Sequence, residues 1–512
     1  MAIVSRAIPT LLRGVSQASD STKQPDHADI QDNADSSPVQ GLQKRSGTQY
    51  LATLNSFPTD ANVHIHTINR DTTERYVSVF TNGAIKVYEI DGTLKTVNTP
   101  DGTTYLQTTN PRSEIKTVTI ADFTFVVNTS KVIAMDSTLS GGTQTQAIVF
   151  FNQVSDKTTY TVTVDGNTVT HNTATDSTLS TSTVALSIKN SLESALTGFQ
   201  IERKGPVLHI KKTNGTNFSI QSTDTQGDTQ ITTVKDSVQR FSDLPAVSPN
   251  NYVVEVKGDD NTNFDNYYVK FVTNNGGAFE EGQWEETLDP GINFKFNYDT
   301  MPHVLIRQSD GNFIFARVDG GTYTVSGTTF TLPLWGERTV GDLITAPNPS
   351  FVGNTINNVF FFRNRLGFLT DDNVVLSRVS EFFNFFPETV LSVIDSDPID
   401  VAASHTKVSI LKHAKTMGQE LILFSDQTQF VLSASSDALT PKTANVNVAT
   451  EFENDTNSVP VSSGRSIYFL IKKGLFAGVR EYVTMEDLTI KEAADITIHV
   501  PKYIPANIFK MA

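Results

Sequence analysis

The sequence predicts a mainly β protein, with a propeller-like antiparallel β core, an inserted small α+β domain and an extended N-terminal arm. Three observations support this fold class. Hydrophobic residues make up 38% and charged residues 19% of the 512 positions, so polar uncharged residues fill much of the chain, a composition typical of short strands and turns. Short alternating stretches are separated by Asn-Gly and Asp-Gly pairs. One stretch has strong helical spacing. A chain of this length should contain roughly two to four domains.

Residues 1–55 are predicted to form the N-terminal arm. Their segment 16–49 is polar, has no clear periodicity and is interrupted by proline and glycine, as at Pro25 and Gly41. Such a composition favours an extended, solvated chain. Since the segment is too long for an ordinary loop, we expect it to lie against another surface.

Residues 56–146 are predicted to form a β platform region. Val77 and Val79 alternate with polar neighbours, and Asn82-Gly83 supplies a turn before the alternation resumes. Asn-Gly provides the positive φ angles that a tight hairpin needs.

Residues 147–230 are predicted to form an inserted α+β domain. A helix is expected at about 184–197, because apolar residues recur there at helical spacing and Gly198 follows as a stop signal. The residues on its apolar face are Ala185, Ile188, Leu192 and Ala195. Alternating stretches before and after this helix predict flanking strands.

Residues 231–512 are predicted to form a β-propeller-like region. Hairpin-like pairs recur through it without a strict repeat. They lie at 304–318, 358–378, 421–432 and 466–483.

Composition also excludes several kinds of site. The chain has no cysteine, which excludes disulfides, cysteine-based zinc sites and thiol nucleophiles. Its net charge of −15 disfavours wrapping of nucleic acid, which requires clustered Lys and Arg. No run approaches ~18 apolar residues, so no membrane-spanning helix is expected. No phosphate-binding loop, dinucleotide fingerprint or zinc-protease motif is present, and we expect no cofactor.

An acidic cluster surrounds one tryptophan. Glu280, Glu281, Glu285 and Glu286 flank Trp284. Glycosidases use paired carboxylates as acid and base, and an aromatic ring can serve as a sugar platform. The simpler interpretation, which we favour, is a solvated acidic hairpin anchored by one tryptophan.

A second candidate resembles the start of a calcium-binding loop. Asp259, Asn261 and Asn263 have the correct spacing, but Phe264 replaces the required glycine and Lys270 replaces the final glutamate. We therefore expect an Asn-rich turn and no metal.

Histidines suggest two further sites. His64 and His66 share one face of an expected strand and could bind a metal, but no third ligand is near in sequence. Ser404, His405 and Asp400 could suggest a catalytic triad. We reject it, because neighbouring residues on a strand point to opposite faces.

Two arginines lie within a phenylalanine-rich stretch. Arg363 and Arg365 are expected on one face of a buried strand. Since a buried guanidinium needs an anionic partner, we expect a structural ion pair with Asp395, Asp397 or Asp400.

The same stretch carries a family resemblance. The segments 357–378, 382–387 and 395–401 resemble the nozzle protein, or tail tubular protein B, family of short-tailed T7-like bacteriophages. Further segments agree in order along the chain. They are Gly14–Gln17, Gly41–Arg45, Met301–His303, Ser309–Phe313, Pro349–Gly353, Gln429–Leu432 and Asp495–Pro501.

The resemblance implies a structural virion protein and not an enzyme. Proteins of this family form a ring, understood to be hexameric, below the portal and the adaptor ring of tail tubular protein A type. The ring encloses the channel for double-stranded DNA, and its outer face helps to hold the tail fibres. We expect the protein in the virion tail, after assembly in the cytoplasm of the host bacterium. An acidic bore would repel DNA phosphates without recognising sequence.

Two alternatives and one departure accompany this expectation. A tail-associated glycan-degrading enzyme would use the cluster around Trp284, and a receptor-binding adhesin would use the Thr/Asn-rich β surface. The family's members continue past the segment corresponding to Ile498–Pro505, whereas this chain ends at Ala512. It is either a shortened relative or part of a longer product, so we expect an incomplete C-terminal β region.

Overall fold

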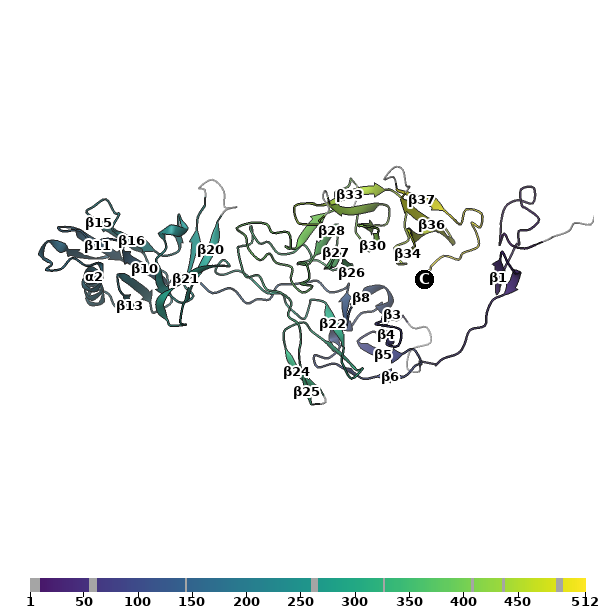
Figure 1. The fold of residues 1–512 in the computed structure, drawn as a ribbon, viewed down its shortest axis with the longest axis horizontal. Coiled ribbons are helices and arrows are strands. Elements are labelled where there is room, and N and C mark those ends of the chain that lie inside the picture. The colour runs from purple at the N-terminus through teal and green to yellow at the C-terminus, as the bar shows by residue number, and fades with distance from the viewer. Residues whose placement is uncertain are drawn as a thin grey trace, which may run out of the picture.

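The computed structural model describes residues 10–54, 62–142, 145–258, 266–325, 327–406, 409–434, 438–484 and 491–512. Strands account for 44% and helices for 6% of the structure, which confirms the mainly β prediction. Figure 1 shows an N-terminal arm, a body of several sheets, and a unit that protrudes from the body on the side opposite the arm. No helix among the described residues is both long and apolar enough to cross a membrane.

Five sheets form the body, and four of them are meanders whose four strands follow one another in chain order. The first sheet contains β3 (His64–Asn69), β4 (Arg75–Thr81), β5 (Ala84–Glu89) and β6 (Leu94–Lys95). The third contains β26 (Asn358–Phe362), β27 (Arg365–Thr370), β28 (Asn373–Leu376) and β29 (Ile399–Ala402). The fourth contains β30 (His413–Met417), β31 (Glu420–Phe424), β32 (Gln429–Ala434) and β33 (Ala444–Thr450). The fifth contains β34 (Val461–Ser463), β35 (Ser466–Lys473), β36 (Phe476–Thr484) and β37 (Lys491–Asp495).

The second sheet joins strands that are far apart in sequence. Its order is β7-β23-β22-β9-β8. The strands are β7 (Val97–Asn98), β8 (Ile115–Ile120), β9 (Phe123–Asn128), β22 (His303–Arg307) and β23 (Phe313–Ala316). The short helix α1 (Pro111–Glu114) leads into β8. The protruding unit is therefore inserted between β9 and β22.

Successive sheets pack side by side, with one edge strand of each sheet adjacent to an edge strand of the next. β3 packs against β8, β8 against β26, β26 against β30, and β30 against β34. Four-stranded antiparallel sheets in this arrangement resemble propeller blades. A closed propeller remains a prediction.

Each pair of neighbouring sheets encloses its own apolar core, because alternate side chains of a strand point to opposite faces. The core between the second and third sheets is rich in aromatic residues. Trp335 is fully buried there and lies edge-to-face with Phe383 at 5.3 Å between ring centroids. Phe368 and Phe385 stack at 5.1 Å. The 32 phenylalanines of this chain thus supply much of the packing.

The protruding unit contains the predicted helix. α2 (Thr181–Ala195) packs against two sheets, of order β13-β14-β10-β16 and β12-β11-β15. Their strands are β10 (Gln146–Phe151), β11 (Thr159–Val164), β12 (Asn167–Asn172), β13 (Phe199–Lys204), β14 (Val207–Lys212), β15 (Ile220–Asp224) and β16 (Ile231–Val234). Because β16 pairs with β10, this sheet extends past residue 230. The limits 147–230 for a separate domain remain a prediction.

A further five-stranded sheet lies at the base of the protruding unit, in the order β17-β19-β20-β21-β18. It contains β17 (Ser237–Val238), β18 (Val247–Pro249), β19 (Val253–Val256), β20 (Tyr267–Thr273) and β21 (Phe279–Thr287). Tyr252 connects this sheet to the preceding one, because its hydroxyl donates to the carbonyl of Lys235 at 2.9 Å. A separate hairpin of the body contains β24 (Thr322–Val325) and β25 (Thr328–Thr331).

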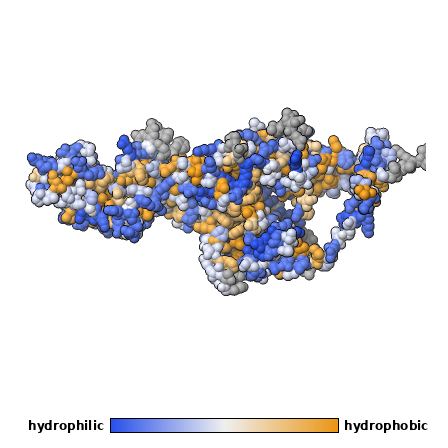
Figure 2. Space-filling model, in the orientation of Figure 1, coloured by the Kyte–Doolittle hydropathy of each residue, from blue (hydrophilic) through white to orange (hydrophobic). Residues whose placement is uncertain are grey.

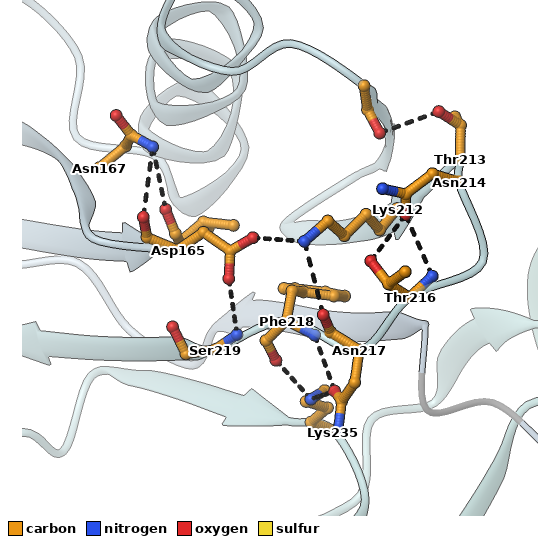
Figure 3. A network of polar contacts seen from close by, with 12 residues as sticks. Asp165, Asn167, Lys212, Thr213, Asn214, Thr216, Asn217, Phe218, Ser219 and Lys235 are labelled. Atoms are coloured by element: carbon orange, nitrogen blue, oxygen red, sulfur yellow. Dashed lines mark hydrogen bonds and ion pairs between the residues drawn. The ribbon is translucent and has the colours of Figure 1, made fainter.

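A polar network fixes one loop of the protruding unit (Figure 3). Asp165 accepts hydrogen bonds from the ammonium group of Lys212 at 2.7 Å and from the main-chain N–H of Ser219 at 3.0 Å. Lys235 donates to the Asn217 side chain within the same loop. The hydrogen bond from Lys212 lowers the pKa of Asp165. These groups satisfy one another, so the network is structural.

The arm forms the hairpin β1 (Ala34–Ser37) and β2 (Gly41–Lys44) and extends away from the sheets (Figure 1). It contacts a segment near the other end of the chain. The main-chain N–H of Gln17 donates to the His499 carbonyl at 2.9 Å, and the Tyr503 hydroxyl donates to the Gln31 carbonyl at 3.3 Å. Figure 2 shows hydrophilic residues over much of the arm and the protruding unit, with hydrophobic residues gathered mainly on the body.

Candidate functional site

The two predicted arginines lie on either side of a tight turn. β26 ends at Phe362 and β27 begins at Arg365, so Arg363 and Asn364 form the turn with φ angles of 46° and 60°. The prediction that Arg363 and Arg365 share one strand face is therefore wrong. Two consecutive positive φ angles give the turn a twist that matches the paired strands. The sequence predicted a hairpin-like pair over 358–378, but not the position of its turn, because arginine, and not glycine, stands beside Asn364.

Arg365 is fully buried in the third sheet and donates to main-chain carbonyls. Its guanidinium N–H groups contact the carbonyl oxygens of Ser377 at 2.7 Å, Asp397 at 2.6 Å and Asp395 at 2.9 Å. The structure thus brings Arg365 against two of the predicted aspartates through backbone oxygens, where the prediction expected carboxylates. Burial lowers the pKa of Arg365 to about 10, against a raising effect of the Asp397 charge. The side chain is charged at neutral pH.

The carboxylates of the predicted aspartates bind other groups. Asp397 accepts from the main-chain N–H of Ile394 at 3.0 Å and of Glu388 at 3.3 Å, which folds the 388–397 loop onto itself. Asp400 accepts from the N–H of Ser350 at 2.7 Å. Asp395 is exposed and contributes its carbonyl to Arg365.

Arg363 connects two sheets. Its guanidinium donates to the carbonyl of Gln419 at 3.0 Å, in the turn between β30 and β31 of the fourth sheet. The two arginines therefore differ in function: Arg365 holds the 388–397 loop against the third sheet, and Arg363 contacts the next sheet.

Sequence reasoning missed a nearby arginine that does form ion pairs. Arg378 pairs with Glu381 at 2.9 Å and also with Glu388. The spacing of three residues between Arg378 and Glu381 was the available signal. These pairs fasten the start of the same 388–397 loop.

The cluster around Trp284 has the geometry of a packed strand. The indole N–H of Trp284 donates to the Pro245 carbonyl at 2.8 Å, and the ring lies edge-to-face with Phe271 at 5.0 Å. Glu281 and Glu285 are exposed on the opposite face of β21. Since the ring faces the core and these two carboxylates face solvent, the cluster does not form a sugar-binding cleft.

Glu286 has a separate structural function. Its carboxylate accepts from the main-chain N–H of Val390 at 2.7 Å and from the hydroxyl of Thr389 at 2.6 Å. Glu286 belongs to β21 of the protruding unit, whereas residues 389 and 390 belong to the 388–397 loop of the body. We call this contact the Glu286 latch.

The two histidines of the candidate metal site are half-buried, and both form hydrogen bonds. His64 shares a 2.9 Å hydrogen bond with Thr117, and His66 shares one of 2.7 Å with Thr119. Burial lowers the pKa of His64 to about 3 and that of His66 to about 4. In the parts of the chain that the structure describes, no three His, Cys, Asp or Glu residues are grouped to hold a metal.

Two candidates remain, the catalytic triad and the partial calcium-binding loop. His405 lies 3.3 Å from a carboxylate oxygen of Glu451, while Asp400 is bound to Ser350, so the triad interpretation has no geometric support. Asp259, Asn261 and Asn263, the partial calcium loop, lie outside the described residues.

Comparisons with known proteins identify a family and an alignment that covers the whole of this chain. The family model described as bacteriophage nozzle protein matches residues 1–512. Tail tubular protein gp12 of Escherichia phage T7 is 35% identical over 531 aligned residues, which cover 100% of this chain and 63% of that protein. The chain thus spans less than two thirds of the length of this relative. A crystal structure of a protein from Lactobacillus plantarum is 12% identical, over 55% of this chain and 77% of its own, with a TM-score of 0.18. A similarity this low carries no argument.

Proposed function

The chain belongs to the bacteriophage nozzle protein family, and from this premise we propose that it is a structural component of the virion tail nozzle. The match to the family over residues 1–512 is the observation that carries the proposal. The position of Glu281 and Glu285, on the face of β21 opposite Trp284, agrees with a structural role. We further propose that the protein is assembled in the cytoplasm of the host bacterium and remains in the virion tail.

We propose that copies of the chain form a ring, hexameric as in the family resemblance, around the exit path of double-stranded DNA. A net charge of −15 per chain supports this conduit, because an acidic bore repels phosphate and lets DNA pass without sequence recognition. A reconstruction of the virion tail by electron cryomicroscopy tests both points. A bore lined by Lys and Arg would contradict the electrostatic argument.

The proposed partners are the adaptor ring above the nozzle and the tail fibres at its side. Complementation tests the role directly. Phage lacking this gene should package DNA but carry incomplete tails, and supplying the chain in trans should restore infectious particles. Normal tails in the gene's absence would refute the proposal.

A matched variant separates a structural role from a glycan-degrading one. The triple variant Glu280→Gln, Glu281→Gln and Glu285→Gln removes three carboxylates and leaves the Glu286 latch intact. A purely structural protein should rescue infectivity fully with this variant. Intact tails without infectivity, together with a lost release of reducing sugar from host glycan, would favour the enzyme.

A further inference from the structure

Cationic and imidazole side chains gather where edge strands of the first four sheets meet. His64 and His66 lie on β3, Lys116 on β8, and Lys412 directly before β30. These strands are brought together because β8 packs against both β3 and β26, and β26 packs against β30. In a chain of net charge −15, this junction is a local excess of positive charge.

Lys116 belongs to β8, the strand that packs against both β3 and β26. Burial lowers the pKa of Lys116 to about 8, and the charge of Lys412 contributes. In the described part of the chain, the Lys116 ammonium has neither a hydrogen-bond partner nor an ion-pair partner. A half-buried cation without a partner is costly, which makes an external anion favourable there.

Asn357 supplies a second unsatisfied donor. Lys412 donates to the side-chain oxygen of Asn357 at 3.3 Å, which leaves the Asn357 amide nitrogen as a donor. That nitrogen is buried and finds no acceptor among the described residues. The neighbouring Asn358 donates to the Lys412 carbonyl at 2.6 Å and so fixes the backbone from which the lysine extends.

The histidines at the junction are uncharged at neutral pH. Burial lowers the pKa of His413 to about 3, with Lys116 and Lys412 adding to the effect. His413 is already bonded to the carbonyl of Thr456 at 2.8 Å. The donors with N–H groups still available are therefore the ammonium groups of Lys116 and Lys412 and the amide of Asn357.

We propose that Lys116, Lys412 and the Asn357 amide form a binding site for a small oxyanion such as inorganic phosphate. An oxyanion offers several acceptor oxygens around one centre, which suits two ammonium groups and an amide N–H. A small ion is favoured over a nucleic-acid duplex, because the donors lie half-buried between packed strands. The site is independent of the proposed tail function.

Thermal unfolding of the full chain in increasing inorganic phosphate tests the site. A ligand that binds only the folded state raises Tm with its concentration. We expect the unaltered chain to show this rise and Lys116→Met to lose it. In phosphate-free buffer, Lys116→Met should be at least as stable as the unaltered chain, since it removes an unpaired half-buried cation. The control Lys204→Met changes an exposed lysine of β13 and should keep the full response.

A second variant keeps the test valid if Lys116→Met does not fold. Asn357→Asp places a carboxylate beside the lysines, so it should raise Tm without phosphate and remove the phosphate response. Equal responses of the unaltered chain, Lys116→Met and Asn357→Asp would overturn the site. A short DNA duplex should give no rise that depends on Lys116, and such a rise would overturn the assignment to a small ion.

Discussion

Arg365 gives its N–H groups to the main-chain carbonyls of residues 377, 395 and 397, inside the third sheet. Arg365→Met would fill similar space but leave at least two buried acceptors without donors. Each lost partner costs about 1–3 kcal/mol, so we expect the loss of two to lower the free energy of unfolding by about 2–6 kcal/mol. Chemical denaturation measures the change. Arg363→Met, at the adjacent turn, serves as the control and should cost less.

A double-mutant cycle shows whether Arg365 and Asp397 brace the same loop. Asp397→Ala removes the acceptor for the N–H groups of Ile394 and Glu388, whose loop also supplies carbonyls to Arg365. We expect the combined loss of Arg365→Met and Asp397→Ala to be smaller than the sum of the single losses. Fully additive losses would show that the two residues act independently.

His303 provides a prediction about pH. The ring stacks on Tyr105 at 4.0 Å, and burial lowers the pKa of His303 to about 4 from its ordinary value of 6.5. The unfolded chain therefore gains a proton below pH 6.5 while the folded chain stays neutral. Stability should be complete above pH 6.5 and should fall as the pH drops towards 4, by up to about 3 kcal/mol from this group. His303→Phe should reduce the slope of Tm against pH across that window, and an unchanged slope would contradict the assignment.

At the scale of elements, the third sheet depends on a glycine opposite an aromatic ring. Gly367 of β27 pairs with Phe360 of β26, and a Cβ at Gly367 would overlap the Phe360 ring and lie 2.8 Å from Leu376. Overpacking a buried sheet costs about 1–3 kcal/mol. We expect Gly367→Ala to lower the free energy of unfolding by this amount in urea. Gly47→Ala, where a Cβ meets nothing within 4 Å, should be neutral.

At the scale of the whole molecule, the Glu286 latch joins the protruding unit to the body. Hydrogen bonds to a charged group contribute about 1.5–3 kcal/mol, and about 1.4 kcal/mol corresponds to a tenfold change in population. Glu286→Ala should therefore speed chymotryptic cleavage at the exposed Leu391 by about tenfold or more. Glu285→Ala, on the opposite face of β21, should leave the cleavage rate unchanged. Equal rates for both variants would mean that the latch does not restrain the loop.

The sequence predicted the structure well where a single local pattern of residues determines it. The apolar spacing of Ala185, Ile188 and Leu192 placed α2 to within a few residues, because a single helix face is buried against strands. It failed at Arg363 and Asn364, since an Arg-Asn turn gives a weaker signal than Asn-Gly. The sequence also could not identify the hydrogen-bond acceptors of Arg365, because these are backbone carbonyls, which every residue has whatever its side chain. The junction around Lys116 depends on which sheets pack against each other in the fold. No local pattern in the sequence predicts which sheets become neighbours.

The contact between the arm and the distant segment at 499–503 has a consequence for synthesis. Gln17 and Lys502 are 485 positions apart and are joined by a 2.7 Å hydrogen bond. At about 5–20 residues per second, roughly 25–100 s pass on the ribosome between the appearance of the two residues. The sheets can form during this interval, but the arm has no docking site until translation has passed its last partner. The arm therefore docks only after the residues of the body have been synthesised.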